Sequence, residues 1–223
     1  MSFDPVTTAT ARDLVDRITP ALADGKLAEA LETVRKLWTT PQLIELLSHN
    51  SSDVRKVAAL SLGLIGDKRA VQPLAVALHD TDAMVTQVAE HALWSVWFRL
   101  GKCAAICLVK HGNCHLHHGN YDVAVEKYSQ AIAADPEFAE AYNQRAIAHY
   151  LGERFEQSVA DCEATLARIP QHFGAMAGKG HCYAHLKQWP DARRCYRLAL
   201  AIHPRLDGVA ATLHQIDDLL RSS

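Results

Sequence analysis

The sequence predicts an all-α protein, a right-handed superhelix (solenoid) in which helix pairs stack one after another. Two internal periods carry this prediction. Prolines at positions 136, 170 and 204 divide the C-terminal half into equal intervals, and apolar residues of the N-terminal half recur at a second, slightly shorter interval. A fixed period of about 20–50 residues is the signature of a stacked repeat. An apolar stripe from Leu206 to Leu220 then predicts a last helix that caps the stack.

Composition excludes several classes of function. The 223 residues are 49% hydrophobic and 22% charged, which is typical of a globular chain. A net charge of −2 provides no attractive field for nucleic acid or an anionic membrane, so neither is an expected partner. Residues 1–5 lack the features of a signal peptide, and no apolar run approaches the roughly 20 residues of a membrane span. We therefore expect a cytoplasmic protein with six reduced cysteines and no cofactor.

The first part of the chain predicts a helical pair. Asp4 and Pro5 suit the N-cap and first turn of a helix that should stop near Gly25. A second helix should cover residues 27–37 and end before Pro41.

From Pro41 onward, two units follow one another, each with a short helix, a polar turn and a longer helix that has one apolar face. Apolar residues pair between the units at one constant spacing: Leu43 and Leu74, Leu47 and Leu78, Val54 and Val85, Val57 and Val88, Ala58 and Ala89, and Leu62 and Leu93. With Asp53-Val54-Arg55, Leu62-Gly63 and Ile65-Gly66-Asp67, the segment resembles the short HEAT repeats of phycobilisome lyases. This resemblance covers roughly residues 41–100 and implies a shape; members of that family include bilin-attachment enzymes and plain scaffolds.

Three aromatic residues, Trp94, Trp97 and Phe98, end the second of these units. Rings of this size bury a large apolar area, so we expect them to fill the joint where the repeat type changes. The alternative is an exposed patch for a partner.

The C-terminal half divides into three repeats, 105–138, 139–172 and 173–206, followed by a capping helix over 207–222. Small residues stand at the eighth position of each repeat, where two helices must approach closely. The eighth positions are Gly112, Ala146 and Gly180, the twentieth are Ala124, Ser158 and Ala192, and the twenty-fourth are Tyr128, Cys162 and Tyr196. This pattern resembles the tetratricopeptide repeat (TPR), a pair of antiparallel helices. The middle repeat departs most from it. We expect two domains, 1–101 and 102–223.

By this resemblance, the first helices of the three repeats line a concave groove that takes a partner peptide. Amide side chains there can hydrogen-bond a peptide backbone, and apolar ones offer pockets. The candidate groove residues are Val109, Lys110, Asn113, His117, Asn143, Gln144, Ile147, Tyr150, His181 and His185. The alternative is a groove without a ligand, or one filled by the protein's own terminus.

Co-chaperones of the TPR family hold the carboxylates of heat-shock chaperone tails with a clamp of Lys, Asn, Asn, Lys and Arg. The matching positions here are Val109, Asn113, Gln144, Gly174 and Gly178, so only the first Asn agrees. Without cations at these positions, the charge-assisted bonds to carboxylates are lost. A heat-shock chaperone C-terminal tail is therefore not expected as the partner.

Histidines and cysteines crowd the first helix of the first repeat. His111, Cys114, His115 and His118 are three or four residues apart, the spacing that metal ligands on one helix face need. However, His111 and His115 also occupy positions where a core residue is expected, and no C-x-x-C pair accompanies them. We therefore expect packing, and no metal site.

The sequence holds no phosphate-binding glycine loop, nucleophile elbow or HExxH motif, so no enzyme activity is expected. We predict a non-enzymatic scaffold for protein–protein interaction whose partner, a protein or peptide, binds in the TPR groove. A bilin lyase or chaperone-like accessory protein, acting through the HEAT half, is the alternative.

Overall fold

The computed structural model describes residues 11–221, except for the side chain of Leu22. Every regular element in this range is helical. The helix start expected at Asp4 and Pro5 lies outside the described residues. The chain forms two compact units, Met1–Val96 and Trp97–Ser223. The division therefore falls within a helix, shortly before the expected boundary at 101, because that helix continues without a break to Arg99.

The N-terminal unit contains the predicted helical pair and two HEAT-like units. Its elements are α1 (Ala11–Ala23), α2 (Leu27–Leu37), α3 (Thr40–Leu46), α4 (Ser52–Ile65), the short 3-10 helix η1 (Lys68–Ala70), α5 (Val71–Ala77) and most of α6 (Ala83–Arg99). Helix α3 begins where Thr39 and Gln42 form a reciprocal capping box, with Pro41 in the first turn. The apolar stripe that the two units share is buried, as expected: Val54, Ala58 and Leu62 of α4 and Val85, Ala89 and Leu93 of α6 form part of the core.

An ion pair ties the two HEAT-like units together. Arg55, at the start of α4, binds Asp80 in the turn before α6 through two parallel bonds, Nε to Oδ2 at 2.7 Å and Nη2 to Oδ1 at 2.9 Å. Both side chains are mostly buried, so this bidentate pair fixes the register of one unit on the next.

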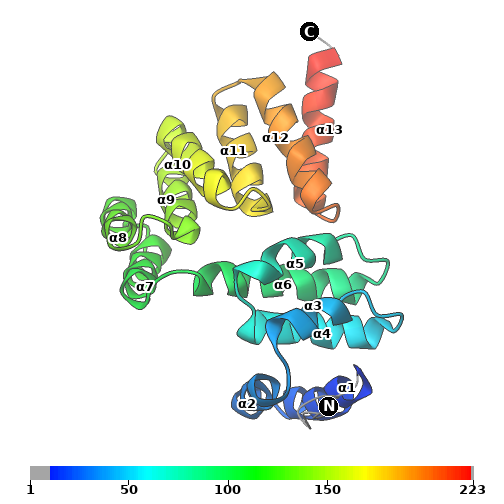
Figure 1. Cartoon of the computed structure of the whole chain (residues 1–223). Coiled ribbons are helices and arrows are strands. Elements are labelled where there is room, and N and C mark those ends of the chain that lie inside the picture. Colours follow the sequence, from blue (N-terminus) through cyan, green and yellow to red (C-terminus); the bar gives the residue numbers. More distant parts are fainter. Residues whose placement is uncertain (1–10, 222–223) are drawn as a thin grey trace. The chain divides into compact units, whose positions relative to one another are not determined.

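The C-terminal unit consists of helix pairs and a cap (Figure 1). The pairs are α7 (Cys103–His117) with α8 (Tyr121–Ala134), α9 (Ala139–Leu151) with α10 (Phe155–Arg168), and α11 (Phe173–His185) with α12 (Trp189–Ile202); α13 (Asp207–Arg221) packs on α12. Helix α9 contacts both α7 and α11, so the first helices of the three repeats are neighbours. The prediction of stacked helix pairs closed by a terminal helix is confirmed.

Side-chain volume explains which small residue stands at each close approach. A Cβ atom added to Gly112 would lie 2.4 Å from Cε1 of Tyr128, and one added to Gly180 would lie 2.7 Å from Cε1 of Tyr196. The middle repeat has the smaller Cys162 in place of tyrosine and accommodates Ala146. At the eighth position of these repeats, glycine is therefore required only where the partner is tyrosine.

The turn inside each repeat needs one residue in the left-handed region. Gly119, Glu153 and Lys187 have φ of 73°, 58° and 59°, and they occupy equivalent positions in the three repeats. Only the first is glycine, the residue that adopts this conformation without strain. The turn geometry is thus repeated even where the residue type is not.

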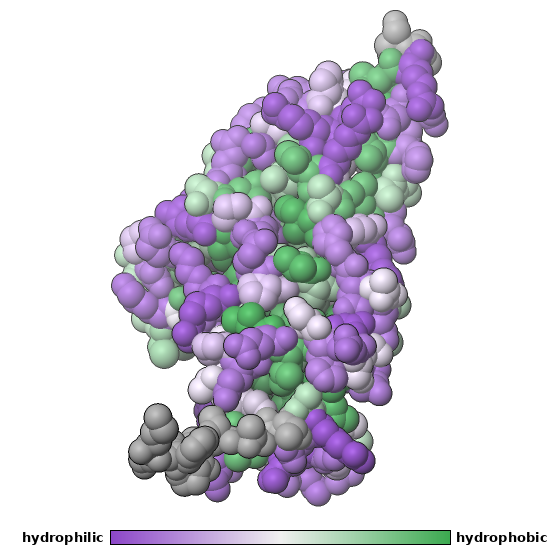
Figure 2. All heavy atoms as spheres, turned by 45° about the vertical axis from the view of Figure 1, so that its right-hand side comes forward, coloured by the Kyte–Doolittle hydropathy of each residue, from purple (hydrophilic) through white to green (hydrophobic). Residues whose placement is uncertain are grey.

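Hydrophilic residues cover most of the face drawn in Figure 2, with hydrophobic residues between them. Among the described residues, no single helix is long and apolar enough to cross a membrane. Helices α6 and α7 pass such a test together by length and composition alone, and a break separates them.

Candidate functional site

A cluster of aromatic and histidine side chains lies where the second and third repeats meet. Tyr150 of α9 contacts both His181 and His185 of α11, with ring centroids 6.4 Å and 5.3 Å apart. Phe155 of α10 stacks on His185 at 4.6 Å. The structure thus brings together three of the predicted groove residues, and adds Phe155, which the groove pattern did not include.

In the first and third repeats, a tyrosine hydroxyl on the second helix makes a hydrogen bond with the residue at position nine of the first helix. Tyr128 donates to Oδ1 of Asn113 at 2.7 Å, and the hydroxyl of Tyr196 lies 2.8 Å from Nδ1 of His181. The second of these pairs is the first one shifted by two repeats along the sequence. Burial raises the pKa of both tyrosines, so both hydroxyls stay protonated at neutral pH.

Two predicted groove residues, Val109 and Asn143, are buried. Their exposed fractions are 0% and 3%, so neither offers its side chain to a ligand. Val109 belongs to the core of the first repeat. Asn143 donates to Oε1 of Glu140 at 3.0 Å, and Gln144 donates to the same oxygen at 2.7 Å. The prediction that these two residues line an open groove is therefore corrected.

Glu140 is itself fully buried, and it belongs to a network with His172 and Trp97. The Nε2 atom of His172 lies 3.1 Å from Oε2 of Glu140, and both side chains are 0% exposed. The backbone N–H of Ala175 donates to Nδ1 of His172, so Nε2 carries the hydrogen that His172 donates to the carboxylate. Trp97 stacks on His172 at 4.0 Å. This buried network fixes one end of α9 to the start of α11.

The remaining candidates are at least partly open to solvent. Lys110 and His117 are exposed on α7, and Ile147 is 38% exposed on α9. Gln144 is half-buried because of its bond to Glu140. The contacts between described residues do not bring Lys110 or His117 to the aromatic cluster.

The middle repeat contains an internal ion pair. Arg145 binds Asp161 through Nε to Oδ2 at 2.8 Å and Nη2 to Oδ1 at 2.7 Å, and its Nη1 donates to Ser129 Oγ of the first repeat at 3.0 Å. His149 Nε2 lies 3.8 Å from Asp161. Burial lowers the pKa of His149, and the Asp161 charge opposes that effect. These groups join neighbouring repeats.

The predicted weak metal candidates do not form a site in the structure. Cys114 and His111 are exposed, and His118 binds the Cys114 carbonyl through Nδ1 at 2.6 Å. His115 is half-buried. Among the described residues, no group of three or more histidine, cysteine or acidic side chains could hold a metal ion.

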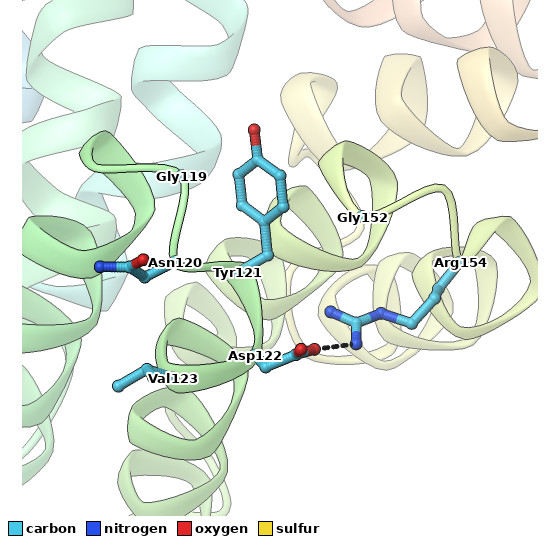
Figure 3. Close-up of a pocket in the computed structure, with 7 residues that line it drawn as sticks. All are labelled: Gly119, Asn120, Tyr121, Asp122, Val123, Gly152 and Arg154. Carbon is cyan, nitrogen blue, oxygen red and sulfur yellow. Dashed lines mark hydrogen bonds and ion pairs between the residues drawn. The ribbon is translucent and has the colours of Figure 1, made fainter.

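One open pocket of about 500 Å³ lies between the turn before α8 and the start of α10. Arg154 reaches across it and pairs with Asp122, while the ring of Tyr121 points away from the pair (Figure 3). The Asp122 side chain is 87% exposed, so this pair is accessible to water. The pocket joins the second helices of two repeats and contains none of the predicted groove residues.

The N-terminal unit has an apolar hollow of its own. One part, about 470 Å³, is lined mainly by apolar residues, including Leu27, Leu64 and Met84; a neighbouring part of about 610 Å³ shares Leu60 and Val88 with it. Leu27 and Met84 are more than half exposed.

Comparisons with known proteins agree with this architecture. Residues 15–94 match a sequence model of HEAT repeats, and residues 109–172 match one of tetratricopeptide repeats. The chain therefore carries HEAT repeats followed by TPRs. The match to the N-terminal half is to HEAT repeats in general, and it does not indicate bilin chemistry.

Similar proteins match about half of this chain. Human tetratricopeptide repeat protein 12 is 31% identical over 120 residues, which are 53% of this chain and 17% of that protein. The Hsp70/Hsp90 co-chaperone cns1 of Schizosaccharomyces pombe is 31% identical over 107 residues, 46% of this chain and 30% of that protein. This chain thus spans less than a third of either relative.

A solved structure contradicts one expectation. The second TPR domain of human RPAP3, in complex with the HSP70 peptide SGPTIEEVD, is 25% identical to this chain with a TM-score of 0.50; the match covers 51% of this chain and 95% of that domain. Together with the co-chaperone relative, it shows that excluding chaperone tails as partners was wrong. The exclusion relied on five clamp positions, and Lys110 and Lys179 each stand one place along the helix from one of them.

Proposed function

We propose that this protein is a protein-interaction scaffold whose TPRs bind a peptide along the first helices α7, α9 and α11. The observation that supports this most is the Tyr150 cluster together with exposed Ile147, which presents apolar and polar side chains on the same helices. Such a mixture suits a peptide that needs both a pocket for a side chain and donors for its backbone.

We further propose that the peptide is an acidic C-terminal segment of the heat-shock chaperone class. Support comes from the similar TPR domain that holds SGPTIEEVD and from the co-chaperone relative. Gly174 and Gly178 carry no charge and Lys179 of α11 pairs with Glu163, so we assign the counter-charge to Lys110 and to the histidines of α7 and α11.

A pair of substitutions tests the binding face. Ile147→Glu places a negative charge on α9, where it should repel an acidic peptide and remove an apolar contact; we expect fluorescence anisotropy with labelled SGPTIEEVD to show at least about tenfold weaker binding. Leu198→Glu is the matched control, because Leu198 is 46% exposed and lies on the second helix α12. Equal affinity of both variants for the peptide, with unchanged Tm, would move the binding face elsewhere.

A further inference from the structure

Two histidines one turn apart on α11 share a single tyrosine. His181 is half-buried and His185 is exposed, and the ring of Tyr150 from α9 lies within 6.4 Å of the first and 5.3 Å of the second. The ring of Phe155 from α10 stacks on the face of the His185 imidazole. Packing from two other helices therefore restricts both imidazole rings.

Hydrogen bonds decide which nitrogen of each ring faces outward. The Tyr196 hydroxyl needs an acceptor because its residue is fully buried, and Nδ1 of His181 lies 2.8 Å away. The Nε2 atom of His181 then carries the hydrogen, and it makes no hydrogen bond with another described residue. The Tyr150 hydroxyl lies 3.0 Å from Nε2 of His185, and a carboxylate at Nδ1 would select the tautomer in which this hydroxyl donates to Nε2 and Nδ1 carries the hydrogen.

The surroundings of the pair are aromatic and uncharged. The titratable groups that face it are Tyr150 from α9 and Tyr196 from α12, while α10 contributes Phe155. The charge that acts on His181 is that of His185, and the Glu156 carboxylate of α10 acts on the thiol of Cys182, one residue along from His181. A ligand carboxylate placed here would therefore meet two N–H donors with no acid bound between them.

We propose that His181 and His185 form a carboxylate-binding site for the acidic end of the peptide, and that this site binds more tightly as the pH falls. The inference rests on the proposed function, because it assigns the counter-charge for the same peptide. At neutral pH the two rings act as oriented N–H donors, and on protonation they become the cations that the positions of Gly174 and Gly178 lack.

The sign of the effect follows from the environment of His181. Burial and, to a smaller degree, the charge of His185 lower the pKa of His181, so the free protein holds it neutral at pH 7.5. A bound carboxylate favours the charged ring and raises that pKa, so binding takes up a proton. Affinity then increases as the pH falls below the value at which the complex is protonated, until the peptide carboxylates are themselves neutralised near pH 4.

The test measures the Kd of full-length protein for SGPTIEEVD by anisotropy at pH 7.5 and pH 5.5, at constant ionic strength. Wild type should bind several-fold more tightly at pH 5.5, since a rise of one unit in one linked pKa gives about tenfold only as the limit at a pH well below both pKa values. The repeat-equivalent of His181 in the first repeat is Asn113, which Tyr128 holds in the same way. His181→Asn should therefore keep an oriented N–H donor and most of the affinity at pH 7.5, but lose most of the gain at pH 5.5.

A second variant separates orientation from charge. Tyr196→Phe removes the hydroxyl that sets the tautomer of His181, so binding at pH 7.5 should weaken several-fold. At pH 5.5 both ring nitrogens carry hydrogen, so this variant should regain most of the wild-type affinity. Circular dichroism at each pH shows whether all proteins remain folded.

Each result is decisive. Peptide binding with the same Kd at both pH values, or a full pH effect in His181→Asn, would overturn the histidine site and leave the binding face in place. If the wild-type protein binds SGPTIEEVD at neither pH, both the chaperone-tail proposal and the histidine site are wrong.

Discussion

The first and third TPRs differ from the second in how their two helices are joined. The outer repeats use a wedge, in which tyrosine fills the space above glycine and its hydroxyl binds the residue at position nine. The second repeat has Cys162 and Ala146 there, and position nine is the exposed Ile147. Its ties are polar instead: the Arg145–Asp161 pair and a bond from Ser158 Oγ to the Ala146 carbonyl at 2.8 Å.

Where the middle repeat departs from the repeat pattern, polar bonds replace the packing of tyrosine on glycine. Ser158, Cys162 and Thr165 make the middle repeat the poorest match to the TPR pattern, yet all three are buried. Thr165 bonds the Asp161 carbonyl, and Ser158 accepts a bond from Cys182 of the next repeat at 3.1 Å. The middle repeat contacts a neighbour on each side, where polar links can set the register.

The largest expected change in the free energy of unfolding comes from breaking the Arg145–Asp161 ion pair of the middle repeat. Asp161→Asn would leave the guanidinium of Arg145 without its carboxylate, and Asp161 is only 7% exposed. We expect a loss of about 3 kcal/mol in the free energy of unfolding, measured by urea denaturation. Asp122→Asn breaks the exposed Arg154–Asp122 pair and should cost less than about 0.5 kcal/mol. Similar losses for both variants would contradict the assignment of the middle tie to a buried ion pair.

The wedge of the first repeat is the next target. Gly112→Ala forces a methyl group against the Tyr128 ring, and we expect about 2 kcal/mol of destabilisation by urea denaturation. Gly178→Ala is the control in a helix of the same kind, where the nearest atom, Cys162 Sγ, would be at an ordinary 3.6 Å. Because alanine is the better helix former, this control should be neutral or up to about 1 kcal/mol more stable. A tolerated Gly112→Ala would mean that the tyrosine can move aside.

The alanine–cysteine pair of the second repeat can be placed in the first repeat by two substitutions. The double variant Gly112→Ala with Tyr128→Cys recreates the residues of positions 146 and 162. The smaller cysteine relieves the clash, so the double variant should be about 1–2 kcal/mol more stable than the sum of the two single effects predicts. A double-mutant cycle in urea measures this coupling energy. Strict additivity would show that the two positions do not compensate for each other.

Regular spacing made most of the fold predictable. The two repeat periods predicted the helix pairs, and the apolar stripe after Leu206 predicted α13. The division between the two units falls inside the continuous helix α6, a few residues before the expected boundary at 101. Periodicity cannot reveal where a helix changes its neighbours.

The candidate site was only partly predictable. The position of a residue in the repeat specifies the helix face on which its side chain lies, but not whether a neighbouring side chain covers it. The rings of Tyr150, His181 and His185 contact one another, although their repeat positions predicted only that they share a face. Asn143 is buried, since its side-chain amide donates to Glu140, and Glu140 is itself buried against His172. That pairing joins the second and the last residue of the same repeat, two positions that the helix pattern of the repeat does not relate to each other.

The smallest expected effect is a pH dependence that distinguishes the repeats. Folding lowers the pKa of His149 in the second repeat and of His181 in the third, chiefly by burial. Above about pH 6.5, the ordinary pKa, both histidines are neutral whether the chain is folded or not, so stability is fully present. As the pH falls below that value, the unfolded chain binds protons that the folded chain resists, and the free energy of unfolding decreases.

The Tm should therefore be lower at pH 5.5 than at pH 7.5, and His149→Gln and His181→Asn should each reduce the difference. The first repeat carries Asn113 at the position of His181, so Asn113→Ala, which removes no titrating group, should leave the difference unchanged. A Tm difference that neither histidine variant alters would assign the pH dependence to other groups.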